Sequence, residues 1–172
     1  MGLSNAISGG IILFGITYVI FTFSGITDSA ASFSYVSSQT TDWESKLLKT
    51  SIDVTISTAT GTTSTFDFEI INTNLEKLWE FDKFDVIITY DHDGTTYTET
   101  MTYVSTCTGL STGKWCIKTW TNDVIDPEIL NRGETITVDV KVNNSLENNR
   151  DVIVVVSTPN GVVASVTTVA VA

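Results

Sequence analysis

The alternation of hydrophobic and polar residues along the chain changes near Thr50. Before that point, residues 6–26 form a near-continuous apolar run, and no acidic or basic side chain lies between Leu3 and Thr27. A run of about 20 apolar residues is long enough for a helix to cross the roughly 30 Å of hydrocarbon in a bilayer. We therefore predict that residues 1–27 form one transmembrane anchor. Its large apolar side chains are Ile11, Ile12, Leu13, Phe14, Ile16, Val19, Ile20, Phe21 and Phe23.

Three other interpretations of residues 6–26, here called the apolar segment, stay open. A cleaved secretory signal wants a basic start and an Ala-x-Ala-like cleavage site, but no basic residue precedes the segment and Asp28–Ser32 is only a loose match. A pilin or archaellin leader normally ends in Lys/Arg-Gly, and Met1-Gly2-Leu3 lacks the basic residue. The third is a buried helix of a soluble protein. We favour an anchor that is not cleaved.

Residues 28–49, here called the stalk segment, join the apolar segment to the rest of the chain. They are rich in Ser and Thr up to Thr41, and no Pro or Gly occurs between Ile26 and Gly61. The membrane helix can therefore continue outward as a stalk, and a flexible spacer is the alternative. Thr41 or Asp42 is also a candidate N-cap for a short helix ending in basic residues.

From Thr50 onward, apolar and polar residues alternate with a period of two, which is typical of strands with one buried face. The alternating runs occupy residues 52–56, 66–70, 86–90, 97–103, 115–117, 136–142, 152–156 and 162–169. Turn sequences separate them, including Asp91–Gly94, Asn131–Gly133 and Pro159–Gly161. Many short strands over about 120 residues are typical of a β-sandwich. We predict an all-β, immunoglobulin-like sandwich over residues 50–172.

Charge and cysteines indicate where this domain works. The net charge is −11, from 20 acids and 9 bases, which opposes binding to nucleic acid and to anionic lipid headgroups. Cys107 and Cys116 bracket a short loop, and a disulfide between them suits an oxidising exterior. Two reduced, buried thiols are the alternative. With the short N-terminal tail, this favours an N-terminus inside the cell and a β-domain in the extracytoplasmic space.

The sequence contains no recognisable catalytic, cofactor or metal site, and we expect no enzyme activity. His92 is the single histidine and falls in a hairpin tip without the partners of a nucleophilic triad. Asp91-His92-Asp93-Gly94 begins like a calcium loop but lacks the distal ligands, so a turn is the better interpretation. The acid pairs Asp82–Asp85 and Asp123–Asp126 fit solvated loops better than glycosidase carboxylates.

One modification site is readable from the sequence. Asn143-Asn144-Ser145 is an N-glycosylation sequon, and it precedes an expected loop. Asn143 is therefore a glycosylation candidate.

Several stretches resemble a known family. They are Met1–Ser4 leading straight into the membrane helix, Phe68–Asn74, Phe81–Tyr90, Ile125–Thr135 and Pro159–Val162. These strand and turn sequences are similar to the archaellum accessory proteins FlaF and FlaG (also called ArlF and ArlG), and to the related archaellin domains. The opening residues favour FlaF over FlaG.

The resemblance implies a structural, stator-like role in the archaeal motility machinery. A single-pass anchor in the archaeal cell membrane would carry a β-sandwich that binds the surface-layer protein or other archaellum subunits, in a homo- or hetero-oligomer. Two alternatives remain. One is a pilin- or archaellin-like filament subunit that assembles through its N-terminal helix, and the other is a membrane-tethered carbohydrate-binding or hydrolytic domain.

Overall fold

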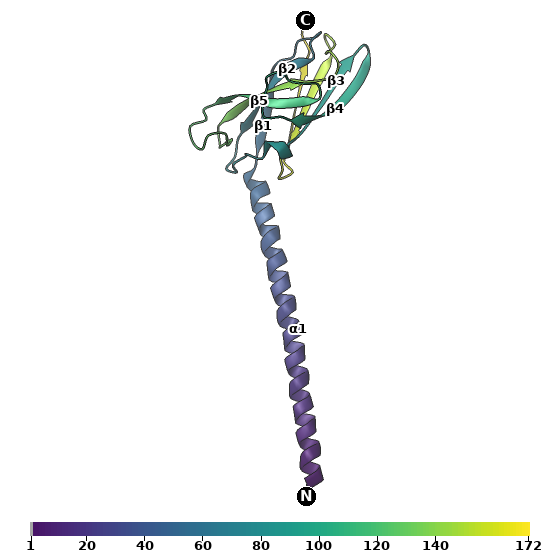
Figure 1. Cartoon of the computed structure of the whole chain (residues 1–172), viewed down its shortest axis with the longest axis vertical. Helices are drawn as coiled ribbons and strands as arrows, with labels where there is room; N and C mark the ends of the chain where they lie inside the picture. Colours follow the sequence, from purple (N-terminus) through teal and green to yellow (C-terminus); the bar gives the residue numbers. More distant parts are fainter. Residues whose placement is uncertain (1) are drawn as a thin grey trace. The chain divides into compact units, whose positions relative to one another are not determined.

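A computed structural model of the chain describes residues 2–172, and the side chains of all of these except residues 2–6 and Ser24. The opening residues on which the preference for FlaF depends therefore lie outside the described side chains. The chain forms two compact units, one up to Glu44 and one from Ser45 to Ala172. Figure 1 shows the helix of the first and the strands of the second.

Helix α1 runs without interruption from Gly2 to Lys49. The stalk segment is therefore helical, and no separate short helix begins at Thr41 or Asp42. The Thr41 hydroxyl donates to the carbonyl of Ser37, 2.9 Å away and one turn earlier, so Thr41 lies inside a helix that has already begun.

The last turn of α1 belongs to the second unit and is bonded to it. The final four carbonyls of a helix lack partners inside the helix. Here each one accepts a hydrogen bond: from the Thr50 hydroxyl at 2.7 Å, the Thr50 N–H at 3.2 Å, the Asn74 side-chain amide at 3.0 Å and the Glu76 N–H at 2.9 Å. Residues Ser45–Lys49 thus fold together with the β-domain, whose compact unit begins before Thr50.

The eight strands of the β-domain form one continuous hydrogen-bonded order, which folds over into two four-stranded sheets packed face to face. One contains β1 (Ile52–Thr58), β2 (Thr65–Asn72), β6 (Thr135–Lys141) and β5 (Lys114–Thr121) in that order, and the other β4 (Thr95–Tyr103), β3 (Asp85–His92), β7 (Asp151–Ser157) and β8 (Val163–Val169). All ladders are antiparallel except a short parallel contact that joins β4 to β5. A 3-10 helix, η1 (Phe81–Lys83), precedes β3. The predicted immunoglobulin-like sandwich with an N-terminal apolar helix is confirmed.

The core lies between the sheets, and the period-two pattern fills it. Every second residue of β2, β6 and β7 is buried, while its neighbours are exposed or half-buried. The fully buried large side chains of the two sheets are Phe68, Ile70, Trp115, Ile136, Val138 and Val140 on one side and Val86, Ile88, Tyr90, Val154 and Val156 on the other. The hydrophobic term that stabilises the domain is therefore concentrated in this layer.

Candidate functional site

The apolar segment exposes its large side chains around the whole helix. Phe14 and Phe21 are each 74% exposed, and all nine predicted anchor side chains are exposed. Within the described residues, α1 is the one helix long and apolar enough to cross a membrane. An apolar surface of this size is stable only against lipid or against other apolar helices. The helix therefore points to a membrane or to an assembly.

Two hydroxyl groups of the apolar segment, those of Thr17 and Thr22, do not oppose burial in lipid. The hydroxyl of Thr17 donates to the Leu13 carbonyl at 2.8 Å, and that of Thr22 donates to the Tyr18 carbonyl at 2.9 Å. Each hydroxyl is thus satisfied inside the helix, which is the condition for placing it in hydrocarbon.

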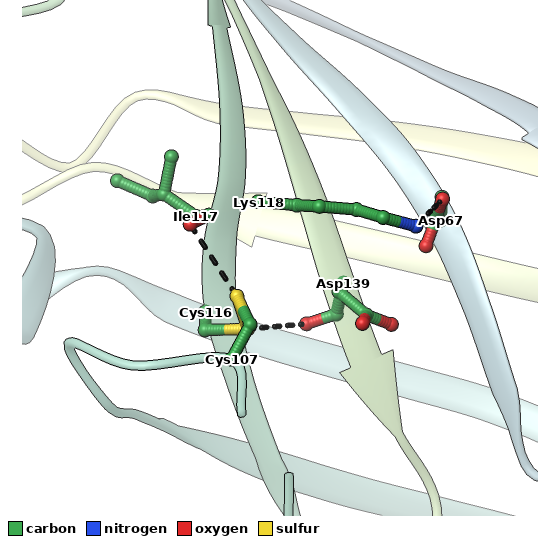
Figure 2. Close-up of a disulfide and its surroundings, with 6 residues drawn as sticks. All are labelled: Asp67, Cys107, Cys116, Ile117, Lys118 and Asp139. Carbon is green, nitrogen blue, oxygen red and sulfur yellow. Dashed lines mark hydrogen bonds and ion pairs between the residues drawn. A yellow bond between two sulfur atoms is a disulfide. The ribbon is translucent and has the colours of Figure 1, made fainter. Parts of the chain in front are cut away.

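Cys107 and Cys116, the pair expected from the sequence, form a disulfide in the structure (Figure 2). Cys116 lies on β5 and is fully buried, while Cys107 lies in the connection that follows β4. Their Cα atoms are 5.4 Å apart, within the usual range for a bridge. The bond fastens this connection to β5, and closing a loop of this size stabilises a fold by about 2–3 kcal/mol.

A charged cluster lies beside the disulfide on the outer face of the same sheet (Figure 2). Asp67 of β2 is directly opposite Asp139 of β6, and the Lys118 ammonium is 2.6 Å from the Asp67 carboxylate. Burial, and then the negative charge of Asp67, raise the pKa of Asp139. The hydrogen bond to Asp67 raises the pKa of Lys118. Sequence reasoning missed this cluster, because only the strand register brings the two aspartates together.

The raised pKa of Asp139 predicts a pH dependence of stability. Between the ordinary pKa of an Asp and the raised one, the folded chain binds more protons than the unfolded chain, so falling pH stabilises the fold and rising pH removes that gain. We expect Asp139→Asn to be more stable than the parent at pH 7, by roughly 0.2–1 kcal/mol as for other cross-strand charge pairs.

Denaturant unfolding at pH 7 and at pH 4 measures this effect. The advantage of Asp139→Asn should shrink at the lower pH, where the parent carboxyl gains its proton. Asp151→Asn, at the exposed start of β7, is the matched control for the loss of one surface carboxylate. An advantage of Asp139→Asn that is equal at both pH values would contradict the assignment.

Three loops bond to one another at the end of the β-domain where β1 ends, at Thr58. This end is here called the far end. The three loops are residues 59–64, the β3–β4 turn and residues 142–150. The Thr62 N–H donates to the Leu146 carbonyl at 2.8 Å, and the Glu147 N–H donates to the Asp91 carbonyl at 3.0 Å. The far end is therefore one connected surface.

The β3–β4 turn is a hairpin turn, as predicted. Asp93 and Gly94 both have positive φ, 48° and 72°, the geometry of a two-residue type I′ turn. Nδ1 of His92 is 2.8 Å from the Ser145 carbonyl, so this nitrogen carries the proton and donates it. The Asp91 carboxylate accepts from the Thr96 hydroxyl at 2.6 Å. His92 thus ties the turn to residues 142–150, and Asp91 braces the hairpin itself.

Of the two acid pairs singled out in the sequence, Asp123 and Asp126 have structural partners. Asp126 pairs with Lys77, and the Asp123 carboxylate accepts from the Glu128 N–H at 3.3 Å. Asp82 lies in η1 and Asp85 begins β3. The described contacts therefore use Asp123 and Asp126 to shape the β5–β6 loop.

A hydrogen-bond network, part-buried at Tyr90 and exposed at Asn143, places the sequon. The Glu99 carboxylate, on β4, accepts from the Tyr90 hydroxyl at 2.5 Å and from the Asn143 N–H at 3.2 Å. The Asn144 N–H in turn donates to the Tyr90 hydroxyl at 3.1 Å. Burial, and then the bond to Glu99, raise the pKa of Tyr90 to about 12. The network fixes the backbone of the loop and leaves the Asn143 side chain exposed.

This geometry sharpens the glycosylation prediction. In protein purified from its own cells, we expect mass spectrometry to find a glycan on the tryptic peptide 142–150, attached at Asn143. Ser145→Ala removes the sequon and should leave the peptide unmodified, while Asn148→Gln in the same peptide should keep the glycan. An unmodified peptide in the parent protein would refute the prediction.

No family model and no curated protein matches this sequence. Among solved structures, the archaeal flagellum of Methanospirillum hungatei strain JF1 is similar with a TM-score of 0.56 and 14% identity, over 96% of this chain and 93% of that chain. The archaellum periplasmic stator protein FlaG from Sulfolobus acidocaldarius is similar with a TM-score of 0.47 and 18% identity, over 69% of this chain and 99% of that chain. The FlaF–FlaG stator complex from the same organism is similar with a TM-score of 0.46 and 18% identity, over 68% of this chain and 87% of that chain.

The similarity to the Methanospirillum structure includes the helix as well as the sandwich, because it covers 96% of this chain. At 14% identity it concerns the fold and not the chemistry of individual residues. Over nearly its whole length, this chain therefore has the fold of the protein solved in the archaeal flagellum of Methanospirillum hungatei.

Proposed function

We propose that this chain is a structural component of the archaellum that is anchored in the archaeal cell membrane and acts as a stator. Its β-domain binds the surface-layer protein or another archaellum subunit in the extracytoplasmic space. The observation that carries the proposal is the apolar segment, which is exposed on all sides of α1. The fold shared with the archaeal flagellum of Methanospirillum hungatei supports the broader part of the proposal, that the chain is a component of the archaellum.

The anchor is a passive one. Each Leu, Ile, Phe or Val near the centre of a membrane helix contributes about −0.3 to −0.6 kcal/mol to insertion, and no acidic or basic side chain between Leu3 and Thr27 opposes this gain. Proton and ion pathways normally keep such a group at membrane depth. The helix therefore holds a position and does not couple to an ion gradient.

The β-domain is suited to binding a neighbour without changing it. The disulfide and the bonded loops of the far end make its surface rigid. One edge is also open: β4 pairs with β5 only at Thr102 and Tyr103, so Thr95–Met101 has a strand partner on one side only. Such an edge can receive an added strand from a partner.

Purification of the tagged full chain from detergent-solubilised cell envelope tests the partner. Recovery of surface-layer protein or of archaellum subunits, identified by mass spectrometry, is the expected result. A chain carrying Thr98→Pro in the open edge is the comparison, since Pro removes a backbone donor from a strand. If neither class of protein is enriched over an untagged control, the stator proposal fails.

The filament-subunit alternative has its own support. The similarity to the Methanospirillum flagellum extends over the helix, through which such a subunit would assemble. Mass spectrometry of the mature N-terminus separates the two functions. Retention of Met1 or Gly2 favours the anchor, and loss of a short leader favours the filament subunit.

A further inference from the structure

The stalk segment presents a physical problem that the anchor does not solve. Beyond the lipid, its helix would stand in water with Phe33 77%, Val36 59% and Trp43 60% exposed. Its sequence is rich in Ser and Thr, which are weak helix formers. Isolated helices of this kind are marginal in water, and helices in proteins are held mostly by packing of an apolar face. The stalk helix therefore needs a partner.

Four of the six large apolar residues exposed in the stalk fall on one stripe, and Tyr35 and Leu48 lie outside it. Phe33, Val36, Trp43 and Leu47 are spaced by three, seven and four residues, and Thr40 fills the gap between Val36 and Trp43. This is the spacing of positions a and d in a seven-residue repeat. Ile26, seven residues before Phe33, begins the stripe inside the apolar segment. The stripe covers about three repeats, roughly 33 Å of helix.

The two polar members of the stripe do not prevent its burial. At a d position, the Ser29 hydroxyl donates to the Gly25 carbonyl at 2.9 Å. At an a position, the Thr40 hydroxyl donates to the Val36 carbonyl at 3.0 Å. Each polar group is satisfied by its own helix, so a partner helix would meet only the methylene of Ser29 and the methyl of Thr40.

The charges of the stalk favour a second copy of the chain as that partner. Although the chain carries a net charge of −11, the acids Asp28 and Asp42 both fall at c positions, on the side away from the stripe. The charges that flank the stripe are Glu44 and Lys46, of opposite sign. In a parallel pair, Glu44 of one copy lies opposite Gln39 of the other, an uncharged amide, at the e and g positions. Self-association therefore meets little like-charge repulsion.

We propose that residues 26–47 of α1 form a parallel coiled coil with the same residues of a second copy. The parallel direction rests on the proposed function, because two copies anchored in one membrane with the same orientation have parallel helices in the same register. The dimer extends the anchor into a stiff two-stranded rod. The paired helices shield Phe33, Val36 and Trp43 from water.

Cysteine cross-linking of the full chain in lipid vesicles tests this arrangement. Val36→Cys places a thiol on the stripe, and Ser38→Cys, two residues later on the outer face, is the matched control. The native disulfide occupies both natural cysteines. After mild oxidation, we expect several-fold more covalent dimer from Val36→Cys than from Ser38→Cys on a non-reducing gel. Equal yields, no dimer, or cross-links only to a different protein in native membranes would each overturn the proposal.

A second variant separates pairing from anchoring. Val36→Glu places a charge on the stripe without touching the apolar segment, and light scattering in detergent should show that it shifts the chain from dimer to monomer. The same variant should remain in the membrane pellet after carbonate extraction. A parent chain that is already monomeric refutes the coiled coil alone, whereas a parent chain that washes off in carbonate refutes the proposed anchor.

Discussion

Ile16→Arg should release the chain from the membrane. Ile16 lies in the middle of the apolar segment, where it is 57% exposed and has no acidic side chain near it in sequence. An Arg at the centre of a membrane helix raises the free energy of insertion by about 2.5–3.5 kcal/mol. Removing the Ile side chain takes away a further favourable contribution of about 0.5 kcal/mol. We expect most of the variant in the soluble fraction after carbonate extraction, while the parent stays in the pellet.

The control for this prediction lies on the same helix. Ser38→Arg introduces the same side chain in the stalk segment, which the anchor hypothesis places outside the lipid. This variant should remain in the pellet like the parent chain. If Ile16→Arg and Ser38→Arg extract equally, the apolar segment is held by something other than hydrocarbon, and the filament-subunit alternative gains.

Phe68→Ala should strongly destabilise the β-domain. Phe68 lies at the centre of β2, is 0% exposed and faces the layer between the sheets. Truncating a buried Phe costs about 3–5 kcal/mol, which combines lost burial with the cavity left behind. Small domains are stable by about 5–15 kcal/mol in total. Denaturant unfolding followed by tryptophan fluorescence should therefore show a strongly lowered midpoint.

Leu75→Ala is the matched control for the core. Leu75 is a large apolar residue of the β2–η1 loop but is 61% exposed. Exposed substitutions usually change stability by less than about 0.5 kcal/mol, so its midpoint should stay near that of the parent. Equal losses in Phe68→Ala and Leu75→Ala would contradict the position of the core.

The period-two pattern predicted the buried face of a strand where the strand pairing is regular, and it failed where a bulge interrupts the pairing. The sequence places Trp115 and Ile117 on one face of a strand, on either side of Cys116, and Trp115 is indeed buried. A bulge between Ile117 and Thr119 then shifts the register. It lets Trp120 meet Phe81 of η1 edge-on, with ring centroids 5.6 Å apart. No local pattern announces a bulge, because it is fixed by the partner strand.

The β5–β6 loop shows the same limit. Asn122, Asp126 and Glu128 all have positive φ, a backbone region that side chains other than Gly adopt at a cost. The loop is held by Asn131, whose side-chain amide donates to the carbonyls of Ile125 at 2.5 Å and Ile129 at 3.1 Å. These contacts exist only once β6 and the loop have folded. The sequence therefore predicted an Asn-Arg-Gly turn but not the hydrogen bonds that hold the loop.

By itself, the sequence determined the class of this protein. It predicted an apolar helix, because a run of apolar residues is not stable in water. It also predicted an all-β domain, because a period of two gives each strand one apolar face that must be buried. Tertiary structure decided the rest. It bonded the last turn of α1 to Thr50, Asn74 and Glu76, and set Asp67 against Asp139. Such contacts depend on residues far apart in the chain, whose meeting is fixed by register and packing and not by local pattern.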